Sequence, residues 1–251
     1  MKYNFVLSGG GARGYAHIGA IKALMELGVE VAAVSGGSSG AIVGALLCDG
    51  YKPEEIESII LREQPRIGLN VRGFRNGLLN FNGIRMLMEK YIRSRSFEEL
   101  RLPLYVSATN LLDGKQKVFS SGDLILPLSA SSAIPMLLAP VEIGGEPFGD
   151  AGMSNNLPVE PFIGKNEKVI GIHVNPVPPY KKNAGLLETI DRSMHIIVGN
   201  STRSSMSMCD LFIEPPALAN YHILQWKKTA EIINTGYEYV KATVSREQLE
   251  R

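Results

Sequence analysis

A serine within a glycine-flanked turn is the first candidate for chemistry in this sequence. Residues 36–40 read GGSSG and match the pattern G-x-S-x-G, with Ser38 at its centre. The pattern follows a short apolar run typical of a strand and precedes an apolar stretch with helical spacing, which is the context of a nucleophile elbow. We therefore expect Ser38 to attack a carbonyl carbon; the alternative is an N-cap serine in an ordinary loop.

A serine hydroxyl needs a base within hydrogen-bonding distance before it becomes a good nucleophile. Asp150 is the best acidic candidate, because it ends a strand-like segment in the small-residue turn GDAG at residues 149–152. A carboxylate is a weak base in water, so it would need partial burial to take the proton from Ser38. The alternative is an Asx turn, which Asp-x-Gly sequences form readily.

Histidine is the usual base in such sites, and the chain has four: His17, His173, His195 and His222. His173 lies near the end of a predicted strand and follows Asp150, so a Ser-His-Asp arrangement that uses His173 stays open. For each of the four, a structural role is the more common one.

A glycine-rich loop, GGGARG at residues 9–14, follows the first predicted strand. It matches G-x-G-x-x-G, but no acidic residue follows the second strand as a dinucleotide site requires. The Gly-Lys-Ser/Thr of a P-loop is missing as well. Glycines without Cβ atoms also allow backbone N–H groups to converge on a developing negative charge, as in an oxyanion hole. The alternative is a tight strand-to-helix turn.

The elements that must position these motifs alternate between strands and helices along the chain. Such alternation predicts an α/β fold with a mostly parallel sheet and helices on both faces, formed as one domain over residues 1–251. All three motifs follow predicted strands, and ligands bind beyond the carboxyl ends of strands in such sheets. We expect strands at residues 3–7, 31–34, 104–108, 116–119, 147–149, 168–174 and 211–213, and helices at 15–27, 39–48, 53–62, 185–207 and 225–243.

The composition excludes several classes of protein. The 251 residues are 45% hydrophobic and 20% charged, which is normal for a packed globule, and the net charge of +1 gives no global basis for nucleic-acid binding. The only cysteines, Cys48 and Cys209, provide neither a disulfide framework nor a zinc-binding spacing. No signal peptide or membrane-spanning run is visible. We expect a cytoplasmic protein, with the surface of a membrane as a second place where it acts.

Three blocks in this order resemble the patatin-like phospholipase family, especially its compact bacterial members. They read SGGGARGYAHIGAIKAL, VSGGSSGAIVGAL and SASSAIPMLLAPVEIGGEPFGDAGMSNNLPV. The resemblance implies a three-layer α/β/α sandwich, a Ser-Asp dyad without histidine, and neither a metal nor an organic cofactor. It makes Ser38 the nucleophile and Asp150 the base. It also assigns the loop: the N–H groups of Gly10, Gly11 and Ala12 would form the oxyanion hole, with Arg13 holding them in place.

Two positions depart from the family pattern. Asp150 is followed by Ala151 and Gly152, where the family has Asp-Gly-Ala or Asp-Gly-Gly, and Gly37 stands where threonine is frequent. Neither change removes a reacting group. The implied reaction is hydrolysis of a carboxylic ester, from a lipid or a small molecule, through an acyl-enzyme. The alternative from another class is a non-catalytic module that binds lipid or regulates a partner.

Two regions bear on the substrate. Ile134, Met136, Leu137 and Leu138 could line an acyl pocket or belong to the core. Residues 66–95 mix basic and apolar side chains, which favours a mobile flap over the sheet edge that contacts anionic lipid headgroups. A solvated basic surface is the alternative. The basic residues are Arg66, Arg72, Arg75, Arg85, Lys90, Arg93 and Arg95, against Glu89 alone. The oligomeric state has no signal in the sequence.

Overall fold

The computed structural model describes residues 1–67, 70–75, 78–80, 82–135, 138–177 and 185–250. Within them, eight strands form one mixed sheet. In spatial order the strands are β10 (Leu211–Ile213), β9 (Lys168–Ile172), β1 (Lys2–Leu7), β2 (Glu30–Gly37), β5 (Leu104–Asn110), β8 (Glu146–Gly149) and β7 (Val141–Ile143), and β6 (Gln116–Phe119) pairs with β5. Strands β10, β9, β1, β2 and β5 are parallel, whereas β6, β7 and β8 are antiparallel. The expected mostly parallel sheet is thereby confirmed.

Side chains alternate between the two faces of the sheet along each strand. Each face is covered by its own hydrophobic core. On β1, Phe5 and Leu7 join a large core, whereas Val6 joins a smaller one with Leu157 and Phe162. The helices of the large core are α1 (Ala16–Glu26), α2 (Ser38–Cys48), α3 (Pro53–Ile67), α4 (Asn82–Tyr91), α5 (Ile125–Ser131), α7 (Thr229–Thr243) and α8 (Arg246–Glu250). The smaller core includes the 3-10 turn η4 (Glu160–Phe162). These layers form the α/β sandwich that the sequence predicts.

Several short elements near the sheet edge were not predicted. The turns η1 (Gly11–Tyr15) and η3 (Ala151–Met153) follow β1 and β8, and the long helix α6 (Leu186–Met206) packs against η3. The prediction of a helix over residues 225–243 was wrong at its start, because a 3-10 turn, η6 (Trp226–Lys228), comes before α7. The remaining 3-10 turns are η2 (Phe97–Glu99) and η5 (Pro216–Asn220).

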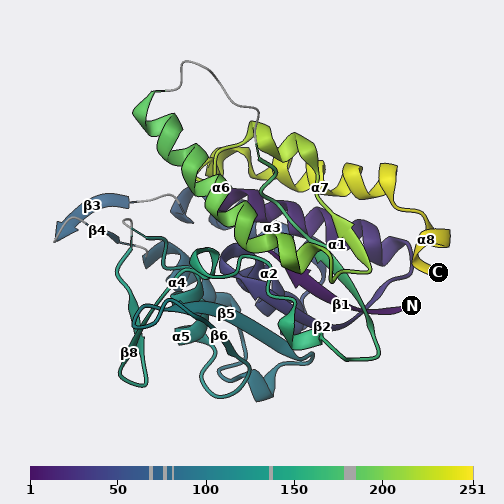
Figure 1. Ribbon diagram of the computed structural model, residues 1–251, viewed down its shortest axis with the longest axis horizontal. Helices are drawn as coiled ribbons and strands as arrows, with labels where there is room; N and C mark the ends of the chain where they lie inside the picture. Colours follow the sequence, from purple (N-terminus) through teal and green to yellow (C-terminus); the bar gives the residue numbers. More distant parts are fainter. Residues whose placement is uncertain (68–69, 76–77, 81, 136–137, 178–184, 251) are drawn as a thin grey trace.

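Residues 66–95 include a separate antiparallel hairpin of β3 (Asn70–Arg75) and β4 (Leu78–Asn80), followed by α4. The hairpin extends from the left side of the molecule, whereas both chain ends lie at the right (Figure 1). On α4, Arg85 pairs with Glu89 at 2.8 Å and Lys90 pairs with Glu63 at 2.7 Å. These ion pairs neutralise part of the basic charge that the sequence displays. The mobility of this segment stays a prediction.

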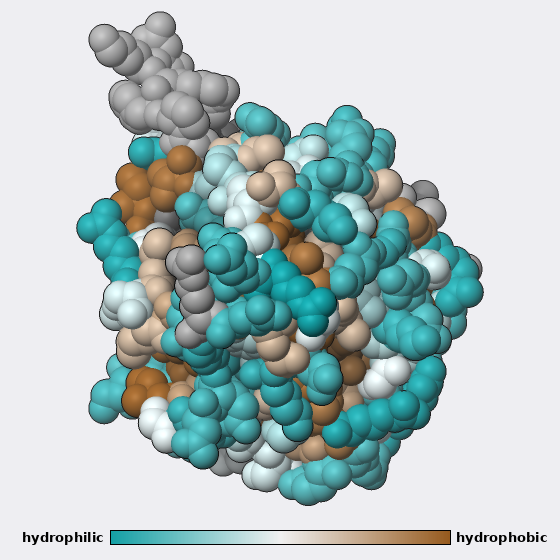
Figure 2. All heavy atoms as spheres, turned by 90° about the vertical axis from the view of Figure 1, so that its right-hand side faces the viewer, coloured by the Kyte–Doolittle hydropathy of each residue, from teal (hydrophilic) through white to brown (hydrophobic). Residues whose placement is uncertain are grey.

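Hydrophilic residues cover most of the face that carries the chain ends, with small groups of hydrophobic residues between them (Figure 2). This mixed surface agrees with the net charge of +1. Among the described helices, none combines the length and the apolar character that crossing a bilayer demands.

Candidate active site

Ser38 lies at the sharp turn where β2 ends and α2 begins. Its φ is 49°, the only positive φ of a non-glycine residue in the described part of the chain. A Cβ atom on Gly36 would come within 2.7 Å of the Ala41 nitrogen, and one on Gly40 within 2.4 Å of the Leu7 oxygen. Both outer glycines of the G-x-S-x-G pattern are therefore required by close backbone packing. Left-handed backbone at a residue with a side chain costs about 1–3 kcal/mol and is typical of functional turns.

A buried hydroxyl supports this turn from outside its own segment. The backbone N–H of Ser38 donates a hydrogen bond of 2.7 Å to Oγ of Ser131, which is fully buried at the end of α5. The bond gives the Ser38 amide a fixed partner and so holds the backbone in its left-handed conformation. Ser131 was missed as a functional candidate, although it belongs to the third sequence block. Nothing in its local spacing pointed to Ser38.

Asp150 is fixed at the end of β8 through its side chain and its backbone. Its Oδ1 accepts a hydrogen bond of 2.8 Å from the Gly152 N–H, so the Asx turn is formed. Its backbone N–H donates to the Ala133 oxygen at 3.1 Å, and its carbonyl accepts from Oγ1 of Thr109 at 2.8 Å. The carboxyl therefore has little freedom to turn away from its neighbours.

The side chains of Ser38 and Asp150 lie close together, and both are at least nine-tenths buried. Burial raises the pKa of Asp150 to about 6, although the hydrogen bonds from Gly152 and Ser38 act in the opposite direction. A carboxyl with this pKa is mostly ionised at neutral pH and still accepts a proton readily. The structure thus brings together the two side chains that the sequence analysis selected.

The two departures from the family pattern are in contact with each other. A Cβ atom on Gly37 would lie 2.8 Å from Cβ of Ala151. The methyl group of Ala151 therefore occupies space that a threonine side chain at position 37 would need. The smaller residue before Ser38 and the larger residue after Asp150 compensate for each other in volume.

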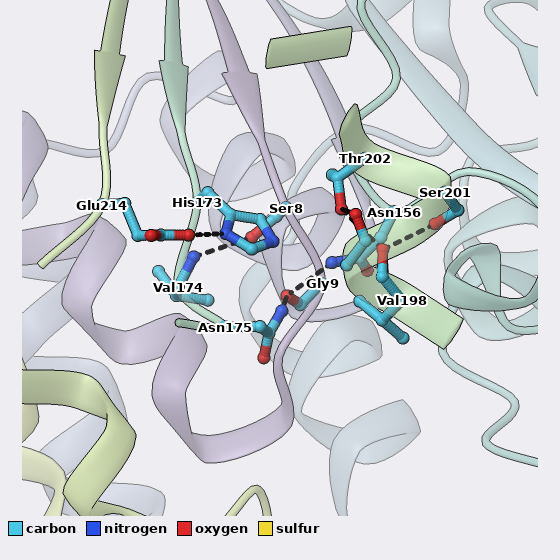
Figure 3. Close-up of polar contacts among 11 residues, drawn as sticks. Ser8, Gly9, Asn156, His173, Val174, Asn175, Val198, Ser201, Thr202 and Glu214 are labelled. Carbon is cyan, nitrogen blue, oxygen red and sulfur yellow. Dashed lines mark hydrogen bonds and ion pairs between the residues drawn. The ribbon is translucent and has the colours of Figure 1, made fainter. Parts of the chain in front are cut away.

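The glycine loop approaches Ser38 and is held from two sides. A Cβ atom on Gly9 would lie 2.9 Å from Cβ of Ser38, so the loop backbone packs directly against the serine. The Gly9 carbonyl accepts hydrogen bonds from the side-chain amides of Asn156 and Asn175, and Figure 3 shows the two asparagines reaching Gly9 from different directions. In a trans peptide the next N–H, that of Gly10, points opposite to this carbonyl and away from both asparagines. Asn175 was not singled out by the sequence analysis.

The predicted N–H donors of this loop differ in their availability. The Ala12 N–H already donates to the Ile223 oxygen at 2.8 Å, so its inclusion as a free donor was wrong. The amides of Gly10 and Gly11 have no hydrogen-bond partner among the described residues. The Arg13 side chain is fully buried, and its Nε donates to the Tyr221 carbonyl at 2.6 Å. Arg13 thereby ties the loop to the segment that precedes α7.

His173 is engaged elsewhere on the sheet edge. Its Nδ1 lies 2.6 Å from Oε1 of Glu214, on the side of the neighbouring strand β10 (Figure 3). No hydrogen bond joins His173 to Ser38 within the described structure. His17 is buried, which lowers its pKa to about 4, and its Nε2 donates to the Ser8 carbonyl. The alternative base therefore lacks the contact that a Ser-His-Asp arrangement needs.

An apolar pocket opens beside Ser38. Of the four residues predicted for an acyl pocket, Ile134 lines it, Leu138 is buried but does not line it, and Met136 and Leu137 lie outside the described residues. Much of the lining comes from helices that sequence patterns did not connect with the site: Ile42 and Val43 of α2, Ile60 of α3 and Leu87 of α4. Among the described residues, no group of three or more His, Cys, Asp or Glu side chains could hold a metal ion.

Comparison with known proteins finds a family match over more than half of the chain. The family model of patatin-like phospholipases matches residues 5–163. An uncharacterized NTE family protein of Mycobacterium tuberculosis is 35% identical over 173 residues, which cover 67% of this chain and 48% of that protein. Lysophospholipase NTE1 of Kluyveromyces lactis is 27% identical, over 93% of this chain and 18% of its own length.

The chain belongs to the patatin-like phospholipase family, a family named for hydrolysis of lipid esters. It spans about half the length of the mycobacterial relative. Among solved structures, VipD from Legionella pneumophila superposes with a TM-score of 0.51 at 14% identity, covering 93% of this chain and 67% of VipD. This likeness supports the α/β fold.

Proposed function

We propose that this chain is a serine acyl hydrolase that cleaves carboxylic esters of lipids through a Ser38–Asp150 dyad. The observation that carries the proposal is the proximity of these two buried side chains, at a strained turn that opens onto an apolar pocket. Family membership supports the reaction class, and the name of the yeast relative, a lysophospholipase, supports a lipid ester as substrate.

In the first half of the reaction, the Ser38 hydroxyl gives its proton to the Asp150 carboxylate as Oγ attacks the ester carbonyl. The negative charge that develops on the carbonyl oxygen is stabilised by the free amides of Gly10 and Gly11 and by the N-terminus of α2. Collapse of the tetrahedral intermediate breaks the ester bond. Asp150 returns the proton to the departing alcohol, and the acyl group stays on Ser38.

In the second half, a water molecule attacks the acyl-enzyme. Asp150 takes a proton from this water, the same amides stabilise the second oxyanion, and the acid is released as Ser38 Oγ regains its proton. One carboxyl thus serves as base and acid in turn. A pKa of about 6 suits both roles, because neither protonation state is strongly disfavoured near neutral pH.

The proposal includes an action at the surface of a membrane by a protein of the cytoplasm. The β3–β4 hairpin, with Arg72, Phe74 and Arg75 on β3, combines the basic and apolar residues that such a contact needs. Deleting residues 68–81 and measuring sedimentation with anionic liposomes tests this part separately. Unchanged binding would remove residues 68–81 from the membrane contact.

The test of the reaction is the release of p-nitrophenol from short and long acyl esters. We expect Ser38→Ala to lose activity, whereas Ser35→Ala keeps it, because Ser35 is buried on the preceding strand β2 and its hydroxyl has no hydrogen-bond partner in the described structure. Equal rates for Ser38→Ala and the unmodified protein would overturn the dyad. No hydrolysis of any ester, together with lipid binding, would favour the non-catalytic lipid-binding module.

A further inference from the structure

The pocket beside Ser38 has a polar end and an apolar end. Ser39 and Ser132 line it next to Ser38, and their hydroxyl oxygens are buried without a hydrogen-bond partner among the described residues. Buried hydroxyl groups without partners are unfavourable, so oxygen atoms of a ligand would satisfy them. This end suits the ester group of a substrate whose carbonyl carbon faces Ser38.

The apolar end extends from there along α2. Ile42 and Val43 lie about one helical turn beyond Ser38 and Ser39, which is a shift of about 5.4 Å along the helix axis. None of the described lining residues carries a charge. An alkyl chain attached to the carbonyl carbon would therefore run from Ser38 past Ile42 and Val43, in an environment that favours it.

Two side chains from other helices also line the pocket. Ile60 of α3 and Leu87 of α4 line the pocket, and only 3% and 5% of their surfaces are exposed. Helix α3 packs against both α2 and α4, so the two side chains belong to one packed wall. Displacing packed side chains of this kind costs stability. They therefore limit the length of alkyl chain that fits in the pocket.

We propose that Ile60 and Leu87 determine the longest acyl chain that the pocket accepts. The inference rests on the proposed function, because it assigns the acyl part of the substrate to this pocket. Each methylene that leaves water for the pocket strengthens binding about fourfold. The gain stops at the chain length that reaches the Ile60–Leu87 wall.

The single tryptophan of the chain makes occupancy of the pocket measurable without turnover. Trp226 lines the pocket, and its ring packs edge-to-face against Tyr15 with centroids 6.0 Å apart. The probes are methyl esters of straight-chain acids from butanoate to dodecanoate. They are titrated against Ser38→Ala, a variant that keeps the pocket and removes the proposed nucleophile, while the fluorescence of Trp226 is recorded.

We expect the affinity to rise about fourfold with each carbon and then to level off. In Ser38→Ala/Leu87→Ala the levelling moves to a longer ester, because truncation of Leu87 opens the wall. Ser38→Ala/Met88→Ala is the matched control: Met88 is fully buried on the same helix but does not line the pocket. In this control the affinity should level off at the same ester length as in Ser38→Ala, even though truncation of Met88 lowers the stability of the protein.

The same substitutions in the chain with Ser38 intact give a second measurement, the kcat/KM for p-nitrophenyl esters of the same acids. Leu87→Ala should shift the preferred length upward and Met88→Ala should not. An identical levelling point with and without Leu87 would overturn the assignment of the wall, as would affinities that do not depend on chain length. Failure of the catalytic proposal would give a different result. The affinity would still rise with ester length and level off as expected, but Ser38→Ala would still hydrolyse esters.

Discussion

Two pairs at the same edge of the sheet each place a carboxyl group beside a polar partner. Asp150 lies beside Ser38 at the ends of β8 and β2, and Glu214 is hydrogen-bonded to His173 after β10 and β9. By residue type, the second pair has the more familiar catalytic composition. Only the first combines a left-handed backbone with an adjoining apolar pocket.

The surroundings of His173 indicate a structural role. The next residue, Val174, donates its N–H to Oγ of Ser8, and Asn175 donates its side-chain amide to Gly9 (Figure 3). The residues that follow β9 therefore hold the start of the glycine loop through hydrogen bonds. Residue type alone therefore identifies only candidates for a catalytic pair. Backbone geometry and access to a pocket distinguish a catalytic pair from a structural one.

Substitutions in the two pairs should differ most in their effect on the rate of ester hydrolysis. We expect Asp150→Asn to lower kcat about 1,000-fold, because an amide cannot accept the proton of Ser38. His173→Ala should change kcat/KM less than about tenfold, since its role lies outside the reaction. It should lower the free energy of unfolding by about 2 kcal/mol through loss of a partly buried hydrogen bond to a carboxylate. Steady-state kinetics and urea unfolding measure both. Comparable losses of kcat in the two variants would contradict the distinction.

The next contrast concerns stability and pH. Folding raises the pKa of Asp150 from 3.8 to about 6, so the folded state holds this proton more tightly than the unfolded state. The resulting stability is full below pH 3.8, decreases as the pH rises, and is lost above about pH 6. Relative to the unmodified protein, Asp150→Asn should therefore be more stable by about 3 kcal/mol above pH 6. The difference should shrink toward pH 4. Urea unfolding across this range checks the sign, and a destabilised variant at pH 8 would refute it.

The contact between the two family departures predicts a compensation. Gly37→Thr should destabilise the fold by about 2 kcal/mol, because the new Cβ would collide with Ala151. Ala151→Gly in the same chain should restore much of this loss. A double-mutant cycle on unfolding free energies measures the coupling, and strictly additive effects would show that the two residues act independently.

The smallest effect concerns the support of the turn. Ser131→Ala removes the partner of the Ser38 N–H, and we expect about a tenfold loss of kcat and about 1 kcal/mol of stability. Ser129→Ala is the matched control, since its hydroxyl donates to the Ile125 carbonyl one turn back in α5 and, among the described residues, makes no bond to Ser38. Equal kcat values for the two variants would mean that Ser131 does not position the nucleophile.

Local patterns predicted the parts of the site that depend on local geometry. Glycines around Ser38, and a strand ending at Asp150, identify turns at the sheet edge. Asp150 reaches the same edge as Ser38 through an antiparallel strand, because β8 ends opposite Thr109, near the carboxyl end of β5. Ser131, Asn175 and the pocket wall at Ile60 and Leu87 could not be predicted in this way. Their roles arise from packing between segments far apart in the chain, which leaves no trace in local spacing.

The same limit explains the error at Ala12. Its N–H is occupied by a carbonyl from residue 223, more than two hundred positions away along the chain. A glycine-rich sequence indicates that amides are accessible to a ligand, but it does not indicate which of them another part of the fold has already engaged.

The central claim is that Asp150, and not a histidine, activates Ser38. The most direct measurement is the rate at which an alkyl fluorophosphonate forms a covalent adduct, followed by mass spectrometry of the intact protein and its peptides. We expect an adduct on Ser38 that forms far more slowly in Asp150→Asn and at an almost unchanged rate in His173→Ala. An adduct on another residue, or a rate that depends on His173 and not on Asp150, would contradict it.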